Sequence, residues 1–369
     1  MQLAGFAGQL VLISMNQVKH FVYPYVIHPN LFSEKFNIKK SLMKYVLLIC
    51  ALFASLNAYP QDCNQASVSQ KPGVWKEGMK GSVSGIPAAD LEKERKIVAE
   101  IHLLIKSKYS PTGVEADFNG SYDRPDADVP VNNYDYNIYF LHYYCEGNVL
   151  KTDHETSTSL SVSANRSDAK IYEKPDENNL PVEGFYSMKK MPVEKDGNYY
   201  FEQNASLGMG ATGKSRTWLI THDNKLPFSY VTRREFLEKQ KNMLTLAMPK
   251  AIEGANQNYR AKTEQDFKKA LAKIETLMKM PSAESDLPAI VKQDPNDYLS
   301  FLFTTNEDAF AKVLIKPNPG YFNSKLPRSS PQFFVLNITG DDKEPVAAKV
   351  MTDVMKDLDL SALRNMLGK

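Results

Sequence analysis

Apolar residues change their spacing several times along the chain, and each spacing predicts an element. Residues 86–110 repeat apolar positions every three or four residues, which predicts a helix opened by Pro87. From Val114 the period falls to two, which is typical of half-buried strands. The expected strands are 134–142, 157–164, 185–193, 198–203 and 216–221. Because they follow one another too closely for crossover helices, an antiparallel meander is predicted.

Two details of this meander can be read from single residues. Gly147-Asn148 favours a hairpin tip, which would bring His142 opposite Asp153. In 157–164 every second residue is a serine, while Thr158, Leu160 and Val162 hold the alternate positions. We therefore expect one buried face on this strand and one solvated serine face.

The second half of the chain begins with helices. Thr232 and Glu235 form a T-x-x-E capping box, which predicts a helix that ends or kinks at Pro249. A second helix is expected to run from Thr263 to Pro281. Strands follow at 298–304, 310–315 and 332–339, and the last helix has Pro345 near its first turn.

The predicted fold class is α+β. After coil at 59–85, an N-terminal helix plus antiparallel meander fills an α+β lobe over 86–231. A helical pair occupies 232–281. A smaller β-rich lobe, closed by a C-terminal helix, occupies 282–369.

Residues 43–58 have the three regions of a secretory signal peptide. Lys39, Lys40 and Lys44 supply the basic region, Tyr45–Leu56 is apolar, and Ala58 offers a small residue for cleavage. The apolar run is too short to span a bilayer, which needs about 20 residues. The expected location is therefore periplasmic or extracellular, with no transmembrane segment in the mature chain.

Residues 1–42 precede this signal and have two interpretations. They are either a non-native upstream extension, with Met43 as the true start, or a long basic region of the signal. The first is favoured because the signal is complete from Met43 onward.

Charge and cysteines narrow the class of protein. Residues 1–58 hold five lysines and one glutamate, so the rest of the chain has 40 of the 45 basic and 42 of the 43 acidic residues. The net charge of this part is close to zero and slightly negative, which argues against nucleic-acid binding. Cys63 and Cys145 remain too, either as a disulfide, which an oxidising compartment permits, or as two buried thiols. Neither Cys50 nor Cys63 follows a small residue, so lipoprotein processing is not expected.

One motif matches a nucleotide-binding pattern. Gly208, Gly213, Lys214 and Ser215 fit G-x-x-x-x-G-K-[ST], in which backbone amides and the lysine hold phosphates. A true P-loop opens a helix, but the residues after Ser215 are β-branched and aromatic. The preferred interpretation is a glycine-rich loop between two strands, with an anion-binding loop as the alternative.

Other candidate sites are weaker. His142 and His154 could belong to a zinc or copper site near the hairpin, but neighbouring strand residues point to opposite faces, so ordinary surface histidines are preferred. No G-x-S-x-G elbow is present, no catalytic residue is assigned and no cofactor is expected.

Five tyrosines could form an aromatic platform for a glycan or peptide, or could simply pack in the sheet. They are Tyr134, Tyr136, Tyr139, Tyr143 and Tyr144.

Several segments resemble uncharacterised exported proteins of Bacteroidota. They are Ser-Pro-Thr-Gly-Val-Glu-Ala at 110–116, Trp-Leu-Ile-Thr-His-Asp-Asn-Lys-Leu-Pro-Phe at 218–228, Val-Thr-Arg-Arg-Glu-Phe-Leu at 231–237, and Lys-Leu-Pro-Arg-Ser-Ser-Pro-Gln-Phe at 325–333. The resemblance is scattered over the mature chain and implies export, but no activity and no functional residues.

These patterns predict an exported, soluble, non-catalytic binding or scaffolding protein of the periplasm or cell surface. Its expected ligand is a peptide, a glycan or an envelope protein. An exported hydrolase with an unrecognised site is the alternative, and nucleotide or phosphate binding at 208–215 is the third hypothesis.

Overall fold

The computed structural model describes residues 63–124, 130–155, 157–166, 171–173, 185–208 and 210–369. The expected signal peptide and the segment before it lie outside the described residues. Helices and mostly antiparallel strands are both abundant in the described part, so the predicted α+β class is confirmed. Within that part, no helix is long and apolar enough to cross a membrane.

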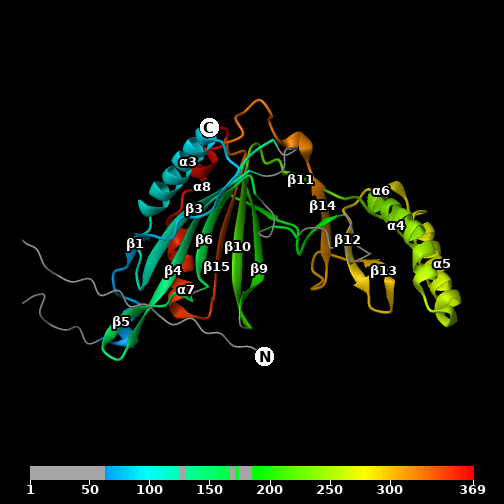
Figure 1. The fold of residues 1–369 in the computed structure, drawn as a ribbon, viewed down its shortest axis with the longest axis horizontal. Coiled ribbons are helices and arrows are strands. Elements are labelled where there is room, and N and C mark those ends of the chain that lie inside the picture. The colour runs from blue at the N-terminus through cyan, green and yellow to red at the C-terminus, as the bar shows by residue number, and fades with distance from the viewer. Residues whose placement is uncertain (1–62, 125–129, 156, 167–170, 174–184, 209) are drawn as a thin grey trace, which may run out of the picture. The chain divides into compact units, whose positions relative to one another are not determined.

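A large sheet joins strands from both ends of the sequence (Figure 1). In spatial order its strands are β1 (Val74–Glu77), β3 (Val114–Asp123), β4 (Asn133–Glu146), β6 (Ser159–Ala164), β15 (Phe333–Gly340), β10 (Ala211–Thr221), β9 (Asn198–Gly208) and β8 (Val193–Lys195). Two short strands lie off this path: β2 (Val83–Ser84) pairs with β3, and β5 (Val149–Thr152) pairs with β4. All neighbouring pairs are antiparallel except those of β1 and β2 with β3.

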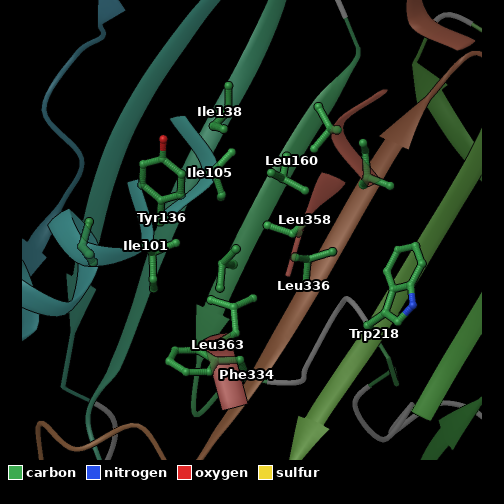
Figure 2. Packing of buried hydrophobic residues seen from close by; sticks show 14 of the residues in the cluster. Ile101, Ile105, Tyr136, Ile138, Leu160, Trp218, Phe334, Leu336, Leu358 and Leu363 are labelled. Carbon is green, nitrogen blue, oxygen red and sulfur yellow. The ribbon is translucent and has the colours of Figure 1, made fainter. Parts of the chain in front are cut away.

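Three helices pack their apolar side chains against one face of this sheet. They are α3 (Ala88–Lys106), α7 (Pro345–Asp357) and α8 (Leu360–Arg364). Helix α3 begins after Pro87, as expected, and buries Val98, Ile101 and Ile105 of the predicted stripe. Figure 2 shows Ile101 and Ile105 beside Tyr136 and Ile138 of β4. Burial of this apolar surface is the main stabilising contribution to the fold.

A smaller sheet and four further helices complete the described chain. The sheet has the order β11 (Phe228–Tyr230), β14 (Lys312–Pro317), β12 (Ile290–Asp294) and β13 (Asp297–Phe303), and β7 (Tyr186–Met188) also pairs with β14. The helices are α2 (Gln65–Val68), α4 (Arg233–Gly254), α5 (Arg260–Leu277) and α6 (Ser282–Ser285). Short 3-10 turns lie at Gln257–Tyr259 and Pro319–Tyr321.

Helices α4 and α5 share an apolar core with the smaller sheet. Phe236 of α4, Phe267 of α5 and Phe301 of β13 are all buried in it. Thr232 and Glu235 form the predicted capping box, with each side chain accepting a hydrogen bond from the other residue's backbone amide.

The sheets do not follow the lobe boundaries expected from the sequence. Strand β15 lies within 282–369 but pairs with β6 and β10 inside the large sheet. Strands β7 and β11 lie within 86–231 but pair with β14 in the smaller sheet. The alternation of apolar residues in a strand indicates which face is buried, but it does not indicate which strand is the partner. The pairing of these strands across the expected lobe boundary could therefore not be predicted from neighbouring residues.

Three local expectations are corrected. Residues 59–85 are not all coil, because they include α2, β1 and β2. Helix α4 does not end at Pro249 but continues to Gly254, so the proline lies inside the helix, where it removes one backbone hydrogen bond. The serine face of β6 is not solvated, since Ser161 and Ser163 are buried on a strand that lies between β4 and β15.

A buried polar cluster connects α3, the start of β4 and the loop before β15. The Asn132 amide donates to Glu94 Oε1 at 2.7 Å, and Arg328 Nε donates to Asn132 Oδ1 at 3.4 Å. Glu94 is completely buried, and its Oε2 has no hydrogen-bond partner among the described residues. Burial, opposed by the Asn132 hydrogen bond and reinforced by Asp90, raises the pKa of Glu94 to about 7.

The two cysteines that follow the signal-like segment form a disulfide. Cys63 and Cys145 have Cα atoms 5.5 Å apart, which confirms the disulfide interpretation over two free thiols. The bond ties the chain before α2 to β4, close to the β4–β5 turn. It closes a loop with a sequence separation of 82 residues, so its loss should chiefly favour the unfolded chain.

The first prediction concerns this bond. The double variant Cys63→Ser/Cys145→Ser should lose roughly 2–4 kcal/mol of unfolding free energy, because the unfolded chain regains loop entropy. Urea unfolding of the oxidised protein and the variant measures the difference. An unchanged urea midpoint would contradict a stabilising disulfide.

The second prediction concerns Glu94. Between about pH 4.5 and pH 7 the folded state keeps a proton that the unfolded state releases, so stability should fall as pH rises through that window. The shift corresponds to at most about 3 kcal/mol. Glu94→Gln should remove this part of the pH dependence in urea unfolding at pH 5 and pH 8.

The matched control is Glu92→Gln, which alters an exposed carboxylate on the same helix. It should keep the pH dependence of the parent protein. If Glu94→Gln and Glu92→Gln have the same stability difference between pH 5 and pH 8, Glu94 does not carry the buried proton.

Candidate functional site

A cleft of about 790 Å³ lies between the β4–β5 hairpin, the end of α2 and the start of α7. Most of its polar walls are ionisable side chains. These are His142, Asp153, His154, Glu155 and Glu344, with Tyr143 beside them. Several titratable groups converge in this cavity, so it is the candidate binding site.

The hairpin places two of these groups opposite one another. Gly147 has φ of 60°, which the tight turn after β4 requires and which glycine adopts without strain. The Asp153 backbone amide then donates to the His142 carbonyl at 2.8 Å. The predicted turn and the predicted pairing of these two residues are both present in the structure.

The expected separation of Asp153 and His154 onto opposite faces is wrong. Strand β5 ends at Thr152, so the alternation of a strand does not apply to the next residues. Residues 153–155 turn instead, with Asp153 Oδ1 accepting a hydrogen bond from the Glu155 amide at 2.9 Å. All three therefore line the same cleft.

Glu344 lines the same cleft, although it is about 190 residues beyond the hairpin in the sequence. It is the N-cap of α7, and its two carboxylate oxygens accept from the amides of Val346 at 3.1 Å and Ala347 at 2.6 Å. A carboxylate is stabilised there by the helix dipole. Sequence reasoning missed Glu344, because only the position of α7 against the large sheet brings it to the hairpin.

Glu344, His142 and Thr158 form a chain of polar contacts. Glu344 Oε2 lies 3.5 Å from His142 Nδ1, and His142 Nε2 lies 3.1 Å from Thr158 Oγ1. An acid, a histidine and a hydroxyl in this order are the components of nucleophilic hydrolysis. Burial lowers the pKa of His142, while the carboxylates of Glu344 and Asp153 oppose that effect.

The hydroxyl of this chain is enclosed by the protein. Thr158 is only 1% exposed and is absent from the walls of the cleft. A Cβ placed on Gly340 would lie 3.3 Å from both Thr158 Cγ2 and Oγ1, so the backbone of β15 covers the side chain. A substrate in the cleft could not reach this oxygen, and the chain of contacts is structural.

His142 and His154, the weaker metal-site alternative, both line the cleft. Over the described part of the chain, no group of three or more His, Cys, Asp or Glu residues could hold a metal ion. The walls contain three carboxylates and neither lysine nor arginine. The cleft is therefore acidic and suited to a positively charged group.

The P-loop-like residues lie in a β-hairpin. Gly208, the last residue of β9, has φ of 88°, Gly210 in the following turn has φ of 80°, and Gly213 lies within β10. Lys214 Nζ donates to Asn204 Oδ1 at 3.0 Å across the two strands. A strand follows the motif, so the helix N-terminus on which a P-loop depends is not formed.

Ser215 belongs to a buried hydrogen-bond network in the centre of the sheet. Asn337 Nδ2 donates to Ser215 Oγ and to Thr217 Oγ1, each at 2.7 Å. Thr339 Oγ1 donates to Asn337 Oδ1 at 3.0 Å. These contacts give Ser215 a structural role that joins β10 to β15.

The five tyrosines do not form one platform. Tyr134 and Tyr136 are buried among the side chains under α3, whereas Tyr139 on the opposite face of β4 is 44% exposed. Only Tyr143 and Tyr144 reach the cleft. Because the five occupy both faces of one strand, the sequence pattern overstated their proximity.

Comparison with protein-family models, with curated proteins and with solved structures finds no match for this chain.

Proposed function

We propose that this protein is an exported, non-catalytic binding protein of the periplasm or cell surface, and that its ligand occupies the acidic cleft at the start of α7. The observation that carries the proposal is the convergence of Asp153, Glu155 and Glu344 on one cavity with neither lysine nor arginine in its walls. A preformed concave site with a few convergent polar groups is the usual form of a ligand site.

Export is supported by two independent features. Residues 43–58 have the pattern of a signal peptide. The Cys63–Cys145 disulfide is typical of proteins that fold in an oxidising compartment.

Charge indicates the class of ligand. An amine or guanidinium group would be attracted by the three carboxylates, and the rings of Tyr143 and Tyr144 could contribute cation–π contacts. A cationic peptide end or a small polyamine has this chemistry. An anionic ligand would be repelled.

The alternative function is a hydrolase, and the contact between His142 and Glu344 favours it. Such an enzyme would need His142 to activate a water, because the Thr158 hydroxyl is enclosed. The binding proposal is preferred since the walls of the cleft contain no lysine or arginine to stabilise a developing negative charge.

The third prediction tests the cleft. Putrescine and arginine methyl ester should bind at low salt and be weakened at least tenfold by Asp153→Asn/Glu155→Gln, as measured by isothermal titration calorimetry. Glu344 is left unchanged because its loss would uncap α7. Glu92→Gln is the control, since it removes an exposed carboxylate outside the cleft.

Two results would contradict the proposal. Absence of a saturable heat with both amines would remove the cleft as a cation site. Hydrolysis of p-nitrophenyl acetate above the buffer rate that disappears in His142→Ala would favour the hydrolase instead.

A further inference from the structure

The outer edge of the large sheet is only partly covered at β9. Strand β8 pairs with Asn198, Tyr199 and Tyr200. From Phe201 to Gly208 the same side of β9 has no strand partner among the described residues. Such an edge presents a row of backbone donors and acceptors that another strand can use.

The sequence before β8 explains why its pairing with β9 stops. Pro192 follows Met191 and has no backbone N–H to give to the ladder. The Met191 amide donates to Asn306 Oδ1 at 2.7 Å and so is directed at the loop before β14. The chain therefore leaves β9 at the residue that pairs with Tyr200.

A groove of about 210 Å³ lies where the two segments diverge. Its β9 wall consists of four consecutive residues, Tyr200 to Gln203. Successive residues of a strand point to opposite faces, so a cavity lined by all four lies beside the edge and not on one face. Its other wall is partly apolar, with Ile171, Met191 and Val193.

We propose that residues 201–208 of β9 bind an extended peptide by strand addition. The peptide continues the line of β8 along β9 and places one apolar side chain in the groove beside Met191 and Val193. Backbone hydrogen bonds supply most of the affinity and the groove supplies selectivity for an apolar residue. This site is separate from the acidic cleft and goes beyond the function proposed for it.

Two features of the β9 edge favour an extended peptide over other occupants: the existing pairing with β8 and the groove where that pairing ends. The β8 end already has a strand seated on β9, so an added strand continues an existing pairing and has a defined starting point. The groove at that point has a volume of about 210 Å³ and a partly apolar wall, which suits a side-chain pocket beside an added strand.

The fourth prediction tests this proposal with synthetic peptides. The probes are fluorescent heptapeptides of alternating valine and threonine with leucine, methionine or phenylalanine at the centre. At least one should bind the purified protein in fluorescence anisotropy. Two further peptides have the same sequence but are N-methylated. The first is methylated on the odd-numbered amides and the second on the even-numbered amides. One set should abolish binding and the other should not, because only alternate amides of an added strand face β9.

Paired protein variants locate the site. Val193→Glu places a charge in the wall of the groove and should weaken the best peptide at least tenfold. Val149→Glu is the matched control, since both valines lie on short strands and are 64% and 59% exposed, but only Val193 lines the groove. Amide hydrogen exchange should slow at alternate residues of 201–208 when the peptide is bound.

Several outcomes would overturn the proposal. These are failure of the whole panel to bind, equal effects of both N-methylated sets, and equal effects of the two valine variants. Concentration-dependent dimerisation that protects 201–208 and excludes the peptides would assign the edge to a second copy of the chain instead.

Discussion

The large sheet depends on the insertion of β15 at its centre. The strand pairs with β6 on one side and β10 on the other, and seven of its eight residues are buried. Phe334, Leu336 and Ile338 belong to the same apolar core as side chains of α3, α7 and α8, while Phe333 and Val335 pack into the core shared with the smaller sheet. The two halves of the large sheet are joined through this strand, which lies close to the C-terminal end of the sequence.

Features set by neighbouring residues could be predicted, and features set by distant residues could not. The helix after Pro87, the turn at Gly147 and the capping box at Thr232 follow from local chemistry and are present. The position of β15 depends on pairing between residues more than a hundred positions apart. The same limit applies to the cleft, where the hairpin and His142 were expected but Glu344 was not. It also explains the buried serines of β6, because a polar face looks the same in sequence whether or not it is covered.

The position of β15 also determines which polar side chains are accessible to a ligand. The strand that completes the sheet covers Thr158 with the backbone of Gly340, which leaves the Thr158–His142–Glu344 contacts without an accessible nucleophile. Strand β15 also engages Ser215 through Asn337, inside the motif that most resembles a phosphate site. Among the described residues, the acidic cleft at the start of α7 and the unpaired part of the β9 edge both stay accessible.

The central role of β15 is tested most directly by native-state hydrogen exchange. If β15 joins the two halves of the sheet, amides of β15 and of its partners β6 and β10 should exchange together, with the highest opening free energy of the described chain. Slow exchange of Leu336 and Ile338, matched by Leu160 in β6 and Leu219 in β10, is the expected result. Exchange of the β15 amides at a lower free energy than those of β3 and β4 would contradict the account, because the sheet would then persist without its central strand.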